Sequence, residues 1–222
     1  MPVCALLLDG SLVFAGGSRV YPGGYPGLPG YPPIYITLGV IMTTVIDPLE
    51  VQFHLVHDCI RACVYADYIA RKSPKKDAWI SIGDICYSEA IMSWNSIFGT
   101  NSQESHWKKL VAKIPLPARS PLKRFGKTMI VEYLGTTEPV WEQYHASLVN
   151  FRNGRLAHFN HNIVREDVPN LTWAMRSACL YREWLLSLLR AHQAAGSDLK
   201  VTETTGEIML AMFNAQIAEI CQ

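Results

Sequence analysis

The sequence predicts an all-α fold, a bundle of four or five main helices that follows a leader of different composition. From position 47 onward, apolar residues recur at helical intervals, and most β-branched residues share that spacing. Capping residues and Pro or Gly breaks divide this part of the chain into helix-length segments with short connections. Alternating runs typical of strands are few, so helix is favoured over sheet.

Residues 1–44 are predicted to be a leader, separate from a helical domain over residues 45–222. The stretch 21–33, YPGGYPGLPGYPP, consists of Pro, Gly and Tyr apart from Leu28. This composition favours extended chain over a helix or a packed core, so the leader is predicted to be disordered. Because typical globular sequence begins just after Met42, a translation start assigned too far upstream is a second hypothesis.

The first two helices follow the leader. Asp47-Pro48 is an N-cap followed by a proline at the first helical position, and helical spacing of apolar residues then continues up to SPKK. Asp77 caps the second segment, which Gly99 and Asn101 end. Apolar residues cover most of its circumference, so we expect this second helix to be largely buried.

The later helices carry similar signals. Residues 104–126 predict one short helix and a proline-rich loop, after which a helical segment reaches Leu134. Thr136 or Thr137 is expected to cap the next helix, with Pro139 in its first turn. The amphipathic segments NLTWAMRSACLYREWLLSLLRAHQ and GEIMLAMFNAQIAEI complete the bundle.

Bulk composition limits the classes of function. The formal net charge of the 222 residues is +1, so attraction to nucleic acid requires a local cluster of charge. The six cysteines lie in apolar surroundings without a CxxC pair, which is typical of reduced thiols and predicts a cytoplasmic protein. Cys59 and Cys63 share a predicted helix, where core packing is favoured over metal binding because a structural zinc site needs four ligands. No run of about twenty apolar residues exists, so no membrane helix is expected.

The helix that ends in FRNGRLAHFNHN places cations on its packing face. On an α-helical wheel that starts at Val140, the apolar residues fall between about 0° and 160°. On the same wheel Arg152 lies at about 120°, Arg155 at about 60° and His158 at about 0°, within or at the edge of the apolar face. Asn153 lies outside that face, at about 220°. Two interpretations follow. Either arginine stems cover apolar surface at the rim of the bundle with their heads in water, or this face opens onto a cleft that binds an anion such as phosphate.

An arginine and a histidine in one site suit RNA cleavage without a metal. An imidazole with an ordinary pKa near 6.5 takes and returns protons at neutral pH, and a guanidinium holds two phosphate oxygens as charge builds on them. Attack of a 2′-hydroxyl on its neighbouring phosphate needs this acid/base assistance and this charge stabilisation. Two copies of the helix at a symmetric interface would supply both a base and an acid.

Arg152-Asn153, four further residues and then His158 resemble the R-[N/D/H]-x4-H signature of HEPN domains, an all-α family. FRNGRLAHFN is similar to the "FRNK..AHF" form of prokaryotic members linked to abortive infection, and SWNSIFG followed by SHWKKL is a further likeness. The resemblance covers about residues 45–220 and implies a HEPN-like helical bundle with the motif on a central helix. It also implies a homodimer whose motif helices form a composite cleft, with an Arg and a His from each subunit.

The function implied by the resemblance is that of a metal-independent endoribonuclease of a toxin or phage-defence kind, without a cofactor, that leaves 2′,3′-cyclic phosphate ends. By position, His158 would be the acid/base, Arg152 would stabilise the phosphorane, and Asn153 would orient either side chain or contact RNA. Arg155 occupies a variable position of the motif and is assigned to RNA contact. RNA, a second copy and an antitoxin or regulatory protein are the expected partners. The alternative is a non-catalytic HEPN module that dimerises or binds nucleotides and regulates a partner.

A basic segment between Ser105 and Val131 is the second candidate site. It holds seven basic residues and no acidic one, a pattern that suits phosphate contacts and that a solvated loop also shows. With the motif present, RNA binding is the favoured interpretation. The residues of this segment assigned to RNA contact are Lys108, Lys109, Lys123, Arg124 and Lys127.

Glu89 and the pair His158 and His161 are two further candidates, each of which also has a purely structural interpretation. Glu89 faces the otherwise apolar side of the second helix, and it is expected to pair with Arg152 or Arg155, either as an ordinary buried ion pair or in support of the catalytic residues. His158 and His161 have a spacing that could chelate a metal, but cysteine or carboxylate ligands at a matching spacing are missing. No metal site is therefore predicted.

Overall fold

The computed structural model describes residues 4–6, 12–14, 48–72, 77–118, 120–157, 168–197 and 206–221. The chain divides into a unit Met1–Thr37 and a unit Leu38–Gln222, close to the predicted boundary after residue 44. In the first unit, strands β1 (Cys4–Leu6) and β2 (Leu12–Phe14) pair antiparallel. These strands were not among the predicted elements. Asp9-Gly10, a dipeptide typical of hairpin turns, is the sequence signal for them. The Pro/Gly/Tyr stretch lies outside the described residues.

The described residues of the second unit confirm the all-α class. Its five helices of 14 residues or more, α1, α2, α5, α6 and α7, correspond to the four or five main helices predicted. The elements are α1 (Pro48–Lys72), α2 (Asp77–Phe98), α3 (Trp107–Lys113), α4 (Lys127–Leu134), α5 (Glu138–Phe151), the π-helix η1 (Arg152–Ala157), α6 (Thr172–Ala194) and α7 (Gly206–Ile220).

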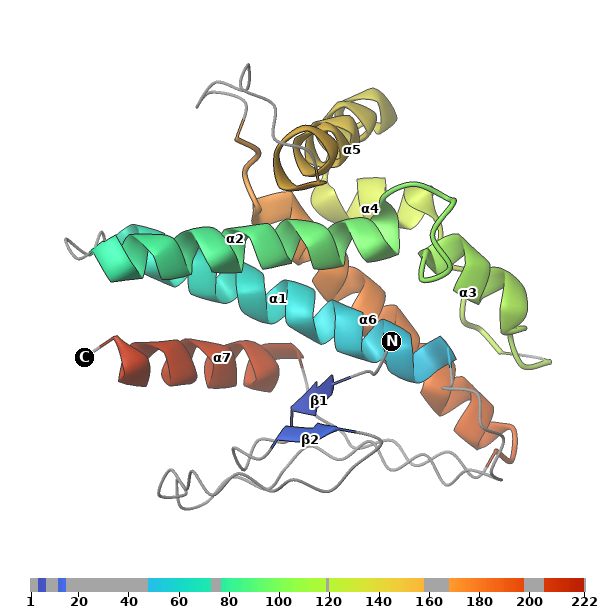
Figure 1. Ribbon diagram of the computed structural model, residues 1–222. Helices are drawn as coiled ribbons and strands as arrows, with labels where there is room; N and C mark the ends of the chain where they lie inside the picture. Colours follow the sequence, from blue (N-terminus) through green and yellow to red (C-terminus); the bar gives the residue numbers. More distant parts are fainter. Residues whose placement is uncertain are drawn as a thin grey trace. The chain divides into compact units, whose positions relative to one another are not determined.

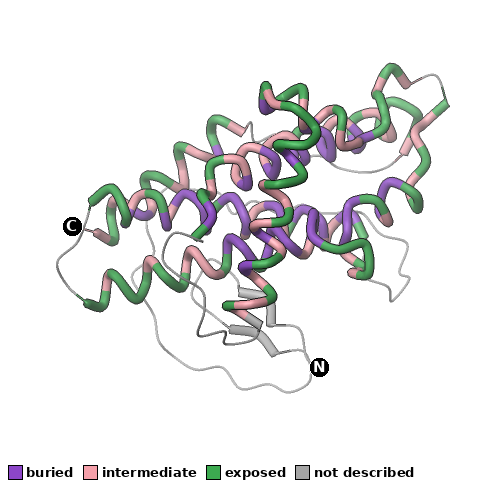
Figure 2. Tube along the Cα trace, turned by 90° about the horizontal axis from the view of Figure 1, so that it is seen from above, coloured by how far each residue is buried: buried purple, intermediate pink, exposed green. Residues whose placement is uncertain are grey.

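The second unit is organised around α1 and α2, which lie side by side and run antiparallel (Figure 1). The long helix α6 crosses both of them, and α7 packs along α1. The shorter α4 contacts α5 and α6, while η1 contacts α2. Buried residues gather where the long helices cross (Figure 2). The predicted motif therefore begins at the edge of the bundle core.

Several helix ends agree with their sequence signals. Helix α1 begins at Pro48, and α7 coincides with the predicted GEIMLAMFNAQIAEI segment. Helix α4 ends at Leu134 because Gly135 adopts a left-handed conformation, with φ of 66°. Thr137 is the N-cap residue of α5, which is one of the two positions predicted for this cap.

The prediction that the second helix is largely buried is wrong for its first half. Ile80 and Ile85 of α2 are 52% and 67% exposed, and Ile82 is exposed as well. The buried residues of α2 lie between Ala90 and Phe98. The bonds from α2 to α5 and α6 come from this later half, because the Trp94 indole reaches α6 and the Asn95 amide reaches α5. Apolar residues around a helix therefore did not imply burial along its whole length.

Trp94 is the centre of an aromatic core that joins α2, α5 and α6. Its side chain is fully buried, and Nε1 donates a hydrogen bond to Oγ of Ser177 at 3.0 Å. Its ring lies 5.4 Å from that of Phe98, 6.1 Å from Trp141 and 5.5 Å from His145, measured between centroids. The contact with His145 places an ionisable side chain directly beside the core.

Candidate functional site

The predicted motif lies on a π-helical turn. The α-helical hydrogen bonding of α5 ends at Phe151, and residues 152–157 continue the helix as η1. The prediction of an uninterrupted α-helix through the motif is therefore wrong, and the angle of about 120° between Arg152 and His158 on the α-helical wheel no longer applies. Short π-helical turns occur frequently at functional sites, where an extra residue re-aims the side chains.

Arg152 is half-buried at the start of this turn. Its Nε is inaccessible to solvent and has no hydrogen-bond partner among the described residues. In the same part of the chain no ion pair involves Arg152 or Arg155. A buried guanidinium N–H without a partner costs free energy, on the order of 1–3 kcal/mol, which a bound anion would recover. Asn153 and Arg155, by contrast, are exposed.

Tyr87 holds together the two ends of the segment that contains His158. Residues 158–167, and with them His158, lie outside the described residues. The Tyr87 ring packs edge-on against Phe151, with centroids 5.8 Å apart, and its hydroxyl donates to the carbonyl of Pro169. Tyr144 of α5 similarly donates to the carbonyl of Asn170 at 2.7 Å. Pro169 and Asn170 therefore lie beside Tyr87 of α2 and Tyr144 of α5.

Glu89 does not pair with either arginine among the described residues. Its carboxylate is exposed and accepts a hydrogen bond from Oγ of Ser93 at 2.8 Å. The charge of Glu89 also contributes to a raised pKa at Asp58 of α1, after the larger effect of burial. On the helix α2, Glu89 lies about 200° from Tyr87, which faces the motif turn. Its place on the α1 side of the helix is the reason why the predicted pairing with Arg152 or Arg155 is absent there.

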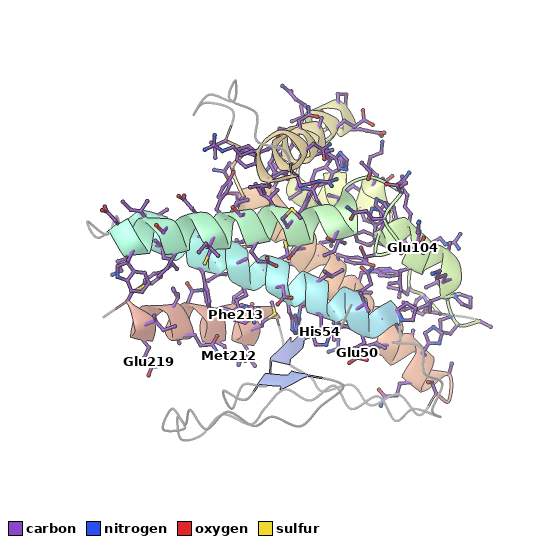
Figure 3. The ribbon with its side chains drawn as sticks, viewed as in Figure 1. Glu50, His54, Glu104, Met212, Phe213 and Glu219 are labelled. Atoms are coloured by element: carbon purple, nitrogen blue, oxygen red, sulfur yellow. The ribbon has the colours of Figure 1, made fainter. Side chains whose placement is uncertain are left out.

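Nearby carboxylates partly neutralise the predicted basic segment. Nζ of Lys109 lies 2.7 Å from Glu104, which stands on the loop before α3 (Figure 3), and Lys113 also pairs with Glu104. Lys127 pairs with Glu138 and with Glu142, the latter at 2.7 Å. The guanidinium of Arg124 donates to the carbonyl of Val111, and Lys123 is exposed. The sequence window contained no acidic residue, but the fold brings carboxylates to it from both flanks.

A pocket of about 420 Å³ lies where α2 ends and α3 and α5 begin. Phe98, Trp107 and Trp141 line its apolar part. Its polar lining includes Thr100, Asn101, His106, Lys108, Lys127, Glu142 and His145.

Two imidazoles lie beside the end of α2 in this pocket. Nε2 of His145 lies 2.6 Å from the carbonyl oxygen of Phe98. A carbonyl oxygen only accepts, so this nitrogen carries a hydrogen and Nδ1 is free to accept. His106 is buried and caps α3, because its Nδ1 accepts from the backbone N–H of Lys108 at 3.1 Å. Burial, reinforced by the charges of Lys108 and His145, lowers the pKa of His106 to about 4.

No protein-family model matches the chain, and neither curated proteins nor solved structures give a match. Functional arguments therefore start from these side chains. Among the described residues, no three His, Cys, Asp or Glu side chains are grouped as a metal site would require. No helix in the described ranges is long and apolar enough to cross a membrane.

Sequence reasoning missed Tyr87, His106 and His145 as site residues. Tyr87 precedes Trp94 by seven residues, which is two turns of helix. Its place on the packing face of α2 could therefore have been predicted from the sequence. His106 belongs to the SHWKKL element, but its capping role depends on where α3 begins. His145 lies one turn after Trp141 on α5, and only the fold shows that the end of α2 is its partner.

Acid is expected to destabilise the protein through two histidines, the half-buried His57 and the buried His106. Burial, with a contribution from the nearby Arg182 charge, lowers the pKa of His57 to about 4, as at His106. The unfolded chain binds these protons below about pH 6.5, whereas the folded chain binds them only near pH 4. The free energy of unfolding therefore decreases as the pH falls from about 6.5 to 4, and these histidines do not change it above pH 6.5. Each histidine should cost about 2 kcal/mol at pH 5 and about 3 kcal/mol at pH 4. Urea unfolding between pH 7 and pH 4 measures the loss.

His106→Asn is the matched variant for this prediction, because asparagine can cap α3 without titrating. Its free energy of unfolding should decline less steeply between pH 6.5 and 4 than that of the wild type. Parallel curves for the two proteins would contradict the assignment to His106.

Proposed function

We propose that this protein is a metal-independent endoribonuclease of the HEPN type, active as a homodimer and serving as a toxin or phage-defence effector. The observation that carries the proposal is the buried Nε of Arg152, which has no hydrogen-bond partner among the described residues, on a π-helical turn. Arg152 opens the R-N-x4-H pattern, whose histidine is His158. A guanidinium N–H with this property suits an anionic ligand.

The proposed reaction is a transesterification within RNA. His158 of one subunit takes the proton of a 2′-hydroxyl, whose oxygen attacks the adjacent phosphorus. Arg152 holds the equatorial oxygens of the phosphorane as negative charge builds on them. The bond to the 5′ oxygen breaks, and a second imidazole, supplied by the other subunit, gives that oxygen a proton. The products are a 2′,3′-cyclic phosphate and a 5′-hydroxyl.

Asn153 and Arg155 are well placed for substrate contact in this proposal. Both side chains are exposed on the same turn as Arg152. An exposed arginine without an ion pair in the described part of the chain can bind a flanking phosphate at little desolvation cost. Asn153 can donate to a phosphate or to a base edge. Lys108, Lys123 and Arg124 have no carboxylate partner among the described residues, whereas Lys109, Lys113 and Lys127 do.

RNA cleavage by the purified wild-type protein in EDTA tests the proposal. We expect single-stranded RNA to be cut with 2′,3′-cyclic phosphate ends, because the reaction draws on imidazole and guanidinium groups alone. End-group analysis by mass spectrometry identifies the products. An RNA whose sugars are 2′-O-methylated lacks the attacking hydroxyl and should remain intact.

Two results would contradict the proposal. Cleavage that EDTA abolishes, or that leaves 5′-phosphate ends, indicates a hydrolytic mechanism of another kind. Homodimerisation without cleavage of any RNA tested favours the non-catalytic HEPN module instead.

A further inference from the structure

The pocket beside α3 and α5 combines an apolar floor with a polar rim. Phe98, Trp107 and Trp141 are buried and form the floor. Thr100 and Asn101 are exposed at the rim, where they offer a hydroxyl and an amide. A volume of about 420 Å³ lies within the usual range of about 300–1,000 Å³ for sites of small ligands. The pocket therefore fits one planar, partly polar group rather than the surface of a folded protein.

The rim carries charges of both signs. Lys108 is exposed, and its Nζ lies 5.5 Å from the centre of the Trp107 ring. Lys127 and Glu142 form an ion pair on one side, and Lys127 is also shared with Glu138. Lys108 has no carboxylate partner among the described residues. It is therefore the cation of the rim that is available to bind an anion.

Two imidazoles cover the end of α2 in this pocket. The last carbonyls of a helix carry partial negative charge, which disfavours a neighbouring anion. His145 donates to the Phe98 carbonyl from Nε2, and its Nδ1 remains outside this bond. Nδ1 can accept a hydrogen bond from an N–H group of a ligand. His106 is bonded to the backbone N–H of Lys108.

We propose that this pocket binds one nucleotide of single-stranded RNA that flanks the scissile phosphate, with Lys108 holding its phosphate and Nδ1 of His145 accepting a hydrogen bond from its base. This proposal rests on the proposed ribonuclease function. Single-stranded RNA is bound by aromatic and apolar surfaces for the base and by cations for the backbone, the combination that this pocket provides. His145 and Arg152 lie seven residues apart along α5 and η1, about 10 Å along a helix axis. The pocket is thus a base-binding subsite separate from the motif turn.

Binding of a non-cleavable RNA tests the pocket independently of catalysis. The probe is a fluorescein-labelled single-stranded RNA with 2′-O-methyl sugars, titrated with the full-length protein and followed by fluorescence anisotropy. Lys108→Ala is expected to weaken binding about three- to tenfold and to reduce the slope of log Kd against log salt by about one. His145→Gln, which keeps a donor for the Phe98 carbonyl but removes the Nδ1 acceptor, should weaken binding about threefold.

Lys72→Ala is the matched control for Lys108→Ala. Lys72 is exposed, and its Nζ also lies 5.5 Å from the centre of a ring, that of Tyr68 at the end of α1. Because Lys72 does not line the pocket, its replacement should leave the affinity unchanged. Circular dichroism and urea unfolding of each variant separate a binding effect from a folding effect.

The outcomes distinguish this proposal from the ribonuclease proposal. Lys108→Ala and His145→Gln binding as tightly as the wild type, or Lys72→Ala losing as much affinity as Lys108→Ala, would overturn the pocket assignment even if RNA is cleaved. Weaker binding in the two pocket variants alone supports the pocket, even if the wild type fails to cleave RNA and the ribonuclease proposal falls.

Discussion

Arg152→Ala is expected to lower the rate of RNA cleavage by about 10²- to 10³-fold, the usual cost of removing one group that stabilises charge in the transition state. Its side chain is half-buried and its Nε has no partner among the described residues, which explains why water would not replace it fully. Arg152→Lys restores the charge without the planar fork, so it should recover only part of the rate. Single-turnover cleavage in EDTA provides the measurement.

Arg71→Ala is the matched control for this substitution. Arg71 lies at the end of α1, where an exposed ion pair joins it to Asp67. Exposed pairs contribute little to stability, so Arg71→Ala should cleave at the wild-type rate. If Arg152→Ala also cleaves at that rate while remaining folded, Arg152 is not the catalytic cation.

Mixed dimers test whether the site is shared between subunits. His158→Ala should be as inactive as Arg152→Ala, with His54→Ala as its control, because His54 is exposed on α1 (Figure 3). Co-expression under two affinity tags isolates dimers of one wild-type and one His158→Ala subunit. Because the proposed site uses the imidazoles of both subunits, this mixed dimer should cleave RNA at far less than half of the wild-type rate. A mixed dimer that retains half of the wild-type rate would contradict the shared site.

Local chemistry explains which parts of the fold the sequence could predict. Proline at the start of α1 fixes φ at a helical value, and glycine after α4 tolerates a left-handed conformation, so these two helix boundaries fall where the sequence indicates. Trp141, Leu148 and Phe151 are buried, as the packing face on the wheel predicted. These properties depend on neighbours within one or two turns.

The features that could not be predicted depend on contacts between distant segments. The π-helical turn begins where η1 meets α2, and the wheel assumed a regular α-helix. The Glu89 side chain lies on the α1 side of α2, and the sequence does not indicate which side of α2 contacts α1. The carboxylates that pair with Lys109 and Lys127 come from outside the basic segment that was counted. Likewise, His145 meets the Phe98 carbonyl across 47 residues of sequence.

Both proposed sites depend on the aromatic core around Trp94. The Trp94 ring contacts Trp141 and His145 of the pocket, and it lies 6.3 Å from the ring of Tyr144, which anchors the segment after the motif. The same indole is bonded to Ser177 of α6. A loss of this side chain should therefore affect three helices together.

Trp94→Ala is expected to lower the free energy of unfolding by about 3–5 kcal/mol, because it removes a fully buried indole and leaves a cavity that the long helices cannot close. Urea unfolding at pH 7 measures this loss. Trp79→Ala is the control on the same helix, since Trp79 is half-buried in the exposed first half of α2 and should cost much less. Trp94→Phe keeps part of the ring volume but loses the bond to Ser177, so an intermediate loss is expected. Equal losses of unfolding free energy for Trp79→Ala and Trp94→Ala would contradict the proposal that the aromatic core around Trp94 stabilises both sites.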